Sequence, residues 1–151
     1  MKREDIRLKV LSDPRMLCAI RGLIRGYTKN LGLAAERAEE VVLAVDEACT
    51  NSMRHSYEGR TDGLLEITLR SDAEAIEIVL RDRGRPAPKE LVKPGGSSPV
   101  NAGTLKPGGL GLQLIRRVFD GVSFRPGREK GNCLLMRLDR SREGEPSQGK
   151  R

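Results

Sequence analysis

The chain has 151 residues, of which 37% are hydrophobic and 32% charged, with a formal net charge of +7 at pH 7. This composition is typical of a folded domain and excludes a disordered chain, and with no tryptophan, two tyrosines and two phenylalanines the core must be mainly aliphatic. No apolar run approaches the roughly 20 residues that span a bilayer, and the polar start resembles no signal peptide, so we expect a cytoplasmic protein without a membrane partner.

The predicted elements begin with a half-buried strand, in which Ile6, Leu8 and Val10 alternate with basic residues. The sequence Ser-Asp-Pro at 12–14 predicts the start of a helix that ends near Gly32. A second helix is predicted from about residue 34 to residue 56, because small apolar residues recur there at helical spacing.

Two alternating strands follow at 65–69 and 76–80. A long segment rich in Gly, Pro, Ser and Asn then leads to a glycine-rich helix start at 108–111, and a hairpin closes the pattern. This order indicates one domain over residues 1–139, an α+β two-layer sandwich in which a mixed, mainly antiparallel sheet carries helices on one face. Residues 140–151 form a polar tail that we expect to be disordered.

The charge and the cysteines narrow the partners only slightly. A basic chain suits nucleic acid, an acidic protein surface or a polyphosphate ligand. The basic residues are spread along the chain without aromatic interleaving, which disfavours base stacking and direct nucleic-acid binding. Cys18, Cys49 and Cys133 are far apart and odd in number, which suits neither zinc nor a disulfide framework. We expect three reduced thiols in the core.

Three polar residues of the second helix, Glu47, Asn51 and His55, lie four residues apart and therefore on one face. That line borders the apolar stripe, so it forms either a ligand site or a solvated helix face. His55 is the only histidine and is unsuited to a metal site by itself.

Two further motifs contain glycine. Asp82 and Gly84 directly follow a strand, where a carboxylate could accept a hydrogen bond from an exocyclic amine, although Asp-x-Gly is also a common turn. The glycines at 108–111 open a helix, whose free amides can bind phosphate, although such starts also occur without a ligand. The P-loop and Rossmann patterns are both absent.

Together and in this order, the three motifs resemble those of the GHKL ATPases, the superfamily of gyrase, heat-shock chaperones and histidine kinases. Residues 45–55 resemble its N box, residues 82–84 its adenine box and residues 109–112 its glycine box, and the similarity extends over residues 6–138. The form of the N box and the length of the chain are similar to those of the anti-sigma-factor serine kinases. The resemblance implies the GHKL (Bergerat) ATP-binding fold.

The resemblance also implies roles for individual residues. Asn51 would ligate Mg²⁺, Glu47 would be the general base, and Asp82 would bind the adenine amine with Gly84 beneath the ring. Arg54 would lie within reach of phosphate, unless it is a surface residue.

In the glycine box, Gly109, Leu110 and Gly111 would bind phosphates through their amides, and Gly108 would be the hinge of an ATP lid over residues 93–107. His55 would orient the network of polar groups rather than react.

One position departs from the family pattern. Asn132 stands where the family often has threonine or serine, and its amide could still donate toward adenine.

The activity implied is that of a MgATP-dependent kinase that phosphorylates a serine of a STAS-type anti-anti-sigma protein, sequesters a sigma factor and forms a homodimer. Two alternatives remain within the same fold, a non-catalytic ATP-dependent switch and a detached histidine-kinase ATP-binding domain.

Overall fold

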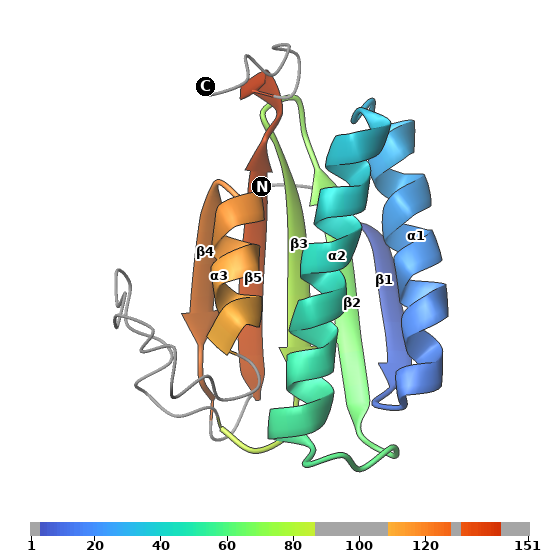
Figure 1. Ribbon diagram of the computed structural model, residues 1–151, viewed down its shortest axis with the longest axis vertical. Helices are drawn as coiled ribbons and strands as arrows, with labels where there is room; N and C mark the ends of the chain where they lie inside the picture. The colour runs from blue at the N-terminus through green and yellow to red at the C-terminus, as the bar shows by residue number, and fades with distance from the viewer. Residues whose placement is uncertain (1–3, 87–108, 128–130, 143–151) are drawn as a thin grey trace.

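The computed structural model describes residues 4–86, 109–127 and 131–142 (Figure 1). Its strands are β1 (Glu4–Leu11), β2 (Leu64–Ser71), β3 (Ala75–Asp82), β4 (Gly121–Arg125) and β5 (Asn132–Asp139). Its helices are α1 (Leu17–Asn30), α2 (Ala35–Asn51) and α3 (Gly109–Val118), with short turns η1 (Pro14–Met16), η2 (Ser52–Ser56) and η4 (Arg140–Arg142).

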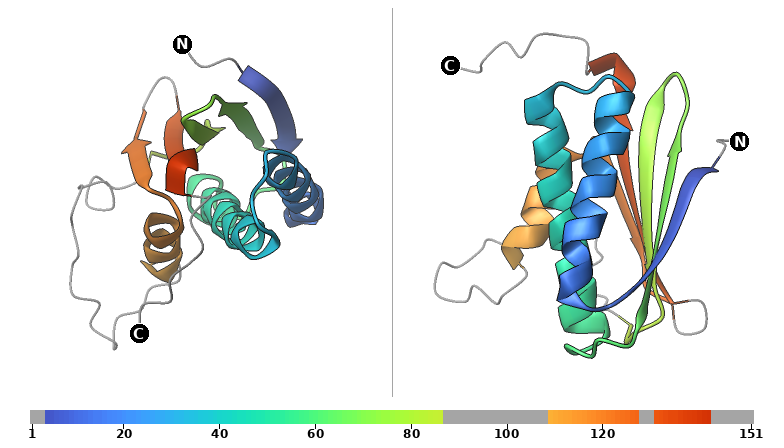
Figure 2. Two further views of the ribbon diagram at one scale, coloured as in Figure 1. Left: turned by 90° about the horizontal axis from the view of Figure 1, so that it is seen from above. Right: turned by 90° about the vertical axis from the view of Figure 1, so that its right-hand side faces the viewer.

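The five strands form one sheet in the order β1-β2-β3-β5-β4. All three helices cover the same face of this sheet (Figures 1 and 2), which confirms the predicted α+β two-layer sandwich. The sequence indicates a mixed, mainly antiparallel sheet, but all four strand pairs among the described residues are antiparallel. The β1–β2 pair is antiparallel because α1 and α2 run in opposite directions and return the chain to the end of the sheet where β1 finishes. β2 therefore starts at that end.

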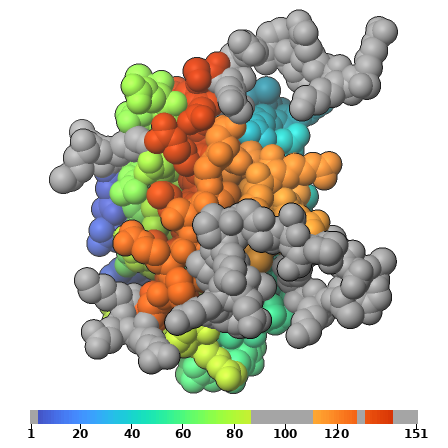
Figure 3. Space-filling model, turned by 90° about the vertical axis from the view of Figure 1, so that its left-hand side faces the viewer, coloured from blue at the N-terminus to red at the C-terminus, as the bar shows by residue number. Residues whose placement is uncertain are grey.

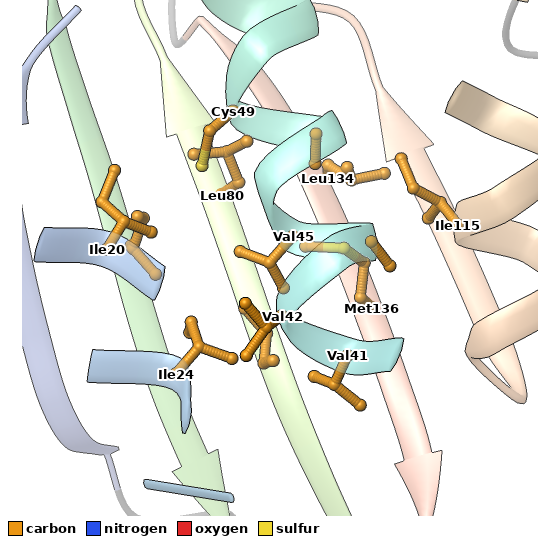
Figure 4. Packing of buried hydrophobic residues seen from close by; sticks show 14 of the residues in the cluster. Ile20, Ile24, Val41, Val42, Val45, Cys49, Leu80, Ile115, Leu134 and Met136 are labelled. Atoms are coloured by element: carbon orange, nitrogen blue, oxygen red, sulfur yellow. The ribbon is translucent and has the colours of Figure 1, made fainter. Parts of the chain in front are cut away.

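The core lies between the sheet and the helices and is mainly aliphatic, as the composition predicts (Figure 4). Ile20 and Ile24 of α1 lie on one side of Val45 of α2, and Ile115 of α3 closes the other side. These side chains are at most 1% exposed. Burying each one stabilises the fold by roughly 1.5–3 kcal/mol, which fixes α2 and α3 relative to the sheet.

The 3-10 turn η1 leads directly into α1, and together they begin and end where the sequence predicts a helix. The Asp13 side chain caps η1 by accepting a hydrogen bond of 2.9 Å from the Arg15 amide, and Pro14 takes the first position of that turn. At the other end Gly32 adopts a φ of +93°, and the Leu33 amide donates to the Thr28 carbonyl at 3.1 Å. This is the Schellman arrangement that favours glycine.

The second helix covers the predicted residues, but its last turn is π-helical instead of α-helical. Its α-helical part ends at Asn51, and Ser52–Ser56 form a π-helical turn in which the Tyr57 amide donates to the Ser52 carbonyl. The wider turn changes the helical period, so the line through Glu47 and Asn51 does not continue regularly to His55.

Two other expectations need correction. Cys18 is exposed on α1, whereas Cys49 is fully buried and Cys133 half-buried, so only Cys49 is a core cysteine. Arg140 belongs to the folded part, because its guanidinium donates to the Asp72 and Leu31 carbonyls at 2.8 and 3.1 Å. The folded part therefore reaches η4, and residues 143–151 lie outside the described residues. Along the described chain, none of the helices combines the length and the apolar character needed to cross a membrane.

Candidate functional site

The motif residues of the sequence meet at one end of the molecule. At the lower end of Figure 1, the last turn of α2 and the end of β3 lie beside the first turn of α3 and the start of β5. The antiparallel pairing of β3 with β5 places Asp82 directly opposite Asn132. From the side that Figure 3 presents, α3 and the β4–β5 hairpin form adjoining parts of the surface.

Asp82 is the centre of a buried polar network. Its carboxylate is at the end of β3 and the residue is 6% exposed. Oδ2 accepts hydrogen bonds from the Ser52 and Ser56 hydroxyls at 2.7 and 2.8 Å. Oδ1 accepts from the Gly84 amide at 3.0 Å and from Asn132 Nδ2 at 2.9 Å. Four donors therefore hold one carboxylate in a fixed orientation.

Asn132 connects this carboxylate to the loop after β3. Besides Asp82, its Nδ2 lies 2.9 Å from the Arg85 carbonyl oxygen and 3.3 Å from Ser56 Oγ. The preceding Gly131 has a φ of +77°, and a Cβ there would collide with the Asp82 carbonyl oxygen. Glycine at 131 thus allows the start of β5 to approach the end of β3 closely.

Backbone contacts fix the turn that contains Gly84. The Arg85 amide donates to the Ser56 carbonyl at 2.7 Å, and a Cβ on Gly84 would overlap that same carbonyl. The Tyr57 hydroxyl accepts from the Arg83 amide at 2.8 Å and donates to the Leu64 carbonyl at 2.6 Å. The turn after β3 is therefore tied to the π turn after α2.

A second cluster lies where α2 meets α3. Glu47 and Asn51 are half-buried and one turn apart on α2. A Cβ on Gly111 would lie 2.8 Å from Glu47 Oε2 and 3.1 Å from Asn51 Nδ2. The absence of a side chain at Gly111 therefore allows the first turn of α3 to contact these two polar groups.

The side-chain amide oxygen of Asn51 is an unpaired acceptor, which favours a bound ligand. Asn51 Oδ1 is buried and has no hydrogen-bond partner in the described part of the chain. An unpaired buried acceptor costs roughly 1–3 kcal/mol, and a hard cation would satisfy it. Among the described residues no group of three or more His, Cys, Asp or Glu side chains could hold a metal. A single protein amide oxygen suits Mg²⁺, which keeps several waters and shares phosphate oxygens.

The remaining predicted site residues differ in how the structure places them. Arg54 and His55 are both exposed in the π turn. Gly109 and Leu110 form the first residues of α3. Gly108 and the expected lid over residues 93–107 lie outside the described residues.

Sequence reasoning missed three members of the site. Ser52 and Ser56 fall within the predicted second helix without a predicted link to Asp82, and no role is predicted for Tyr57. A useful signal was present, because two serines four residues apart on the core side of a helix need a buried polar partner.

Comparisons with known proteins agree with this geometry. Residues 10–138 match the family model described as histidine kinase-like ATPase domain. The chain is 34% identical over 139 residues to "Serine-protein kinase RsbW" of Halalkalibacterium halodurans, which covers 88% of this chain and 82% of the relative. It is 28% identical over 120 residues to the protein of the same name from Bacillus subtilis, covering 78% of this chain and 75% of the relative.

A solved structure supports the fold. The crystal structure of the RsbU and RsbW domains of Rv1364c from Mycobacterium tuberculosis matches with a TM-score of 0.58 and 14% identity, over 89% of this chain and 32% of that longer chain. The chain therefore belongs to the histidine kinase-like ATPases, and within them to the family of the RsbW serine-protein kinases.

Proposed function

We propose that this protein binds ATP with Mg²⁺ at the end of the sheet where α2, β3, α3 and β5 meet, and transfers the γ-phosphoryl group to a protein serine. Asp82 would accept a hydrogen bond from the adenine amine, and Gly84 would leave room for the ring. Asn51 would ligate Mg²⁺ through Oδ1, which is buried and unpaired in the described part of the chain. The amides at the start of α3 would bind phosphate, as helix N-termini do.

The observation that carries the proposal is the convergence of Glu47 and Asn51 on Gly111. A metal-ligating amide and a carboxylate one turn apart, both against a glycine-rich helix start, suit phosphoryl transfer. Such transfer needs mainly positioning and charge neutralisation. When bound, Mg²⁺ supplies the charge neutralisation at the phosphate oxygens.

In this scheme Glu47 is the general base. Its carboxylate would accept the proton of the attacking serine hydroxyl while the oxygen of that serine bonds to the γ-phosphorus and ADP leaves. Glu47 is only half-buried, as a base that meets a protein substrate requires. Arg54, three residues after Asn51, is exposed and would reach phosphate or the partner.

The proposed partners follow from the relatives, which are named serine-protein kinases. We propose a STAS-type anti-anti-sigma protein as the phosphoryl acceptor and a sigma factor as the protein that is sequestered, with the kinase acting as a homodimer. The presence of Glu47 favours a kinase over a non-catalytic ATP-dependent switch of the same fold.

The test is transfer of label from γ-labelled ATP to the STAS-type protein that co-purifies with the chain. Glu47→Gln retains size and hydrogen bonding but cannot take a proton. ATP should therefore bind within a few-fold of wild type, while transfer falls by roughly 10²–10⁴. Glu36→Gln is the matched control, because it makes the same change in the exposed first turn of α2.

Two outcomes would contradict the proposal. Equal labelling by wild type and Glu47→Gln would remove Glu47 from the mechanism. Binding of ATP without any labelling by wild type would favour the non-catalytic switch.

A further inference from the structure

The acceptor capacity of Asp82 is filled by donors of the protein itself. A carboxylate offers roughly four lone-pair sites, two on each oxygen. In the described structure, Ser52 and Ser56 use Oδ2, while the Gly84 amide and Asn132 use Oδ1. An adenine amine that donates to Asp82 must therefore displace one of these four donors.

Three of the four donors lose their bond if they leave. Each serine hydroxyl has a single hydrogen, and both are directed at Oδ2 at 2.7–2.8 Å. The Gly84 amide is fixed by the turn, whose next residue donates to the Ser56 carbonyl. Buried donors without an acceptor cost roughly 1–3 kcal/mol each, so these three groups should stay.

Asn132 is different, because its amide has more acceptors than hydrogens. The NH₂ group carries two hydrogens and lies within 2.9–3.3 Å of three acceptors, namely Asp82 Oδ1, the Arg85 carbonyl and Ser56 Oγ. It can lose the hydrogen bond to Asp82 and still have an acceptor for each hydrogen, the Arg85 carbonyl and Ser56 Oγ. It is also nearly completely buried, at 2% exposed, so the exchange takes place away from water.

We propose that Asn132 is the residue that yields to the adenine amine at Asp82, which makes it a specificity-determining residue of the base site. Resting on the proposed function, this inference assigns Asn132 a role that a single-hydrogen hydroxyl at this position could not fill in the same way. The adenine amine takes the place of Asn132 as a donor to Asp82, so the number of hydrogen bonds at Asp82 does not increase. In the wild-type protein, the binding free energy gained from the amine is consequently reduced by the loss of the Asn132–Asp82 hydrogen bond.

The test compares ATP with purine riboside 5′-triphosphate, which is ATP without the exocyclic amine. Calorimetry should give the ratio of the two dissociation constants for wild type and Asn132→Ala. The variant has no donor to displace, so the preference for ATP should rise by about three- to tenfold, even if both nucleotides bind more weakly. Asn132→Thr, with one hydroxyl hydrogen, should give a smaller rise, and Asn30→Ala at the exposed end of α1 should leave the ratio unchanged.

A structural role for Asn132 would give a different result. If it only braced the Arg85 loop, or if it touched a ring atom that both nucleotides share, both affinities would fall alike. An unchanged or smaller ratio in the variants overturns the inference while leaving the proposed function intact. Failure of wild type to bind either nucleotide overturns both.

A measurement on the wild-type protein covers the case in which the variants do not fold. The side-chain amide resonances of Asn132 in ¹⁵N-labelled protein should shift strongly when ATP is added and much less with the deaminated analogue. Equal shifts with the two nucleotides would overturn the inference.

Discussion

Alanine differs from glycine by one methyl group, and at Gly111 that methyl group would lie 2.8 Å from Glu47 Oε2 and 3.1 Å from Asn51 Nδ2. One of the two polar side chains, or the first turn of α3, must then move. Overpacking of this kind costs roughly 1–3 kcal/mol. We expect Gly111→Ala to weaken MgATP binding at least about tenfold, measured by calorimetry.

Gly26 provides the opposite case in the interior of α1. A Cβ there meets nothing within 4 Å, so Gly26→Ala should stabilise the fold by roughly 0.5–1 kcal/mol through helix propensity alone. Urea unfolding measures this gain, and ATP affinity should not change. If both alanine variants lost ATP binding equally, the proposed contact at Gly111 would be wrong.

Asp82 presents a different problem, because it supports the fold as well as the proposed base site. An amide at this position offers one acceptor oxygen and two hydrogens to four surrounding donors. We expect Asp82→Asn to lower the free energy of unfolding by about 2 kcal/mol or more even without nucleotide. Urea unfolding measures this loss, with Asp62→Asn, which changes an exposed carboxylate, as the control. Equal stability of the two variants would contradict a stabilising role for the hydrogen bonds to Asp82.

At the scale of elements, the spacing of apolar residues and the helix-end signals predicted nearly all of the strands and helices that pack into the core. The alternation in β2 and β3, the N-cap at Asp13 and the glycine at Gly32 all lie where the sequence placed them. The period failed after Asn51, because a π turn follows and no local pattern marks it. The spacing of Ser52 and Ser56 indicates a buried polar partner, but it does not identify Asp82, which lies about 30 residues away in the chain.

The cysteines allow a test of how α1 and α2 face the core. Burial raises the pKa of the Cys49 thiol to about 12, whereas Cys18 is exposed on α1. Because the thiolate is the nucleophile, iodoacetamide at mildly alkaline pH should label Cys18 first and Cys49 last. Peptide mass mapping over time follows the order, and unfolded protein should show three similar rates. Early labelling of Cys49 would contradict the packing of α2.

At the scale of the whole molecule, the sheet and its helices concentrate the motif residues at one end. Asp82 and Asn132 come together only because β3 pairs with β5, a partnership between segments 50 residues apart that periodicity cannot reveal. Family resemblance indicated which residues belong to one site, and the topology explains why they meet. The contribution of Gly131 likewise becomes visible only when β5 approaches the Asp82 carbonyl.

A ligand at this end would contact α2, β3, α3 and β5 at once, so its binding should stabilise the whole domain against unfolding. At a free concentration of 100 times its dissociation constant, a ligand adds about 2.7 kcal/mol, which corresponds to a rise in Tm of about 5–10 °C for a chain of this size. Differential scanning fluorimetry should show that rise with MgATP.

GTP should raise the Tm only slightly, because guanine presents a carbonyl where adenine has the amine that Asp82 would accept from. In Asn51→Ala the dependence of the shift on Mg²⁺ should be lost, since the buried Oδ1 that would hold the ion is gone. An equal rise with GTP would exclude Asp82 as the base-reading group, and a rise in Asn51→Ala that still required Mg²⁺ would place the ion elsewhere.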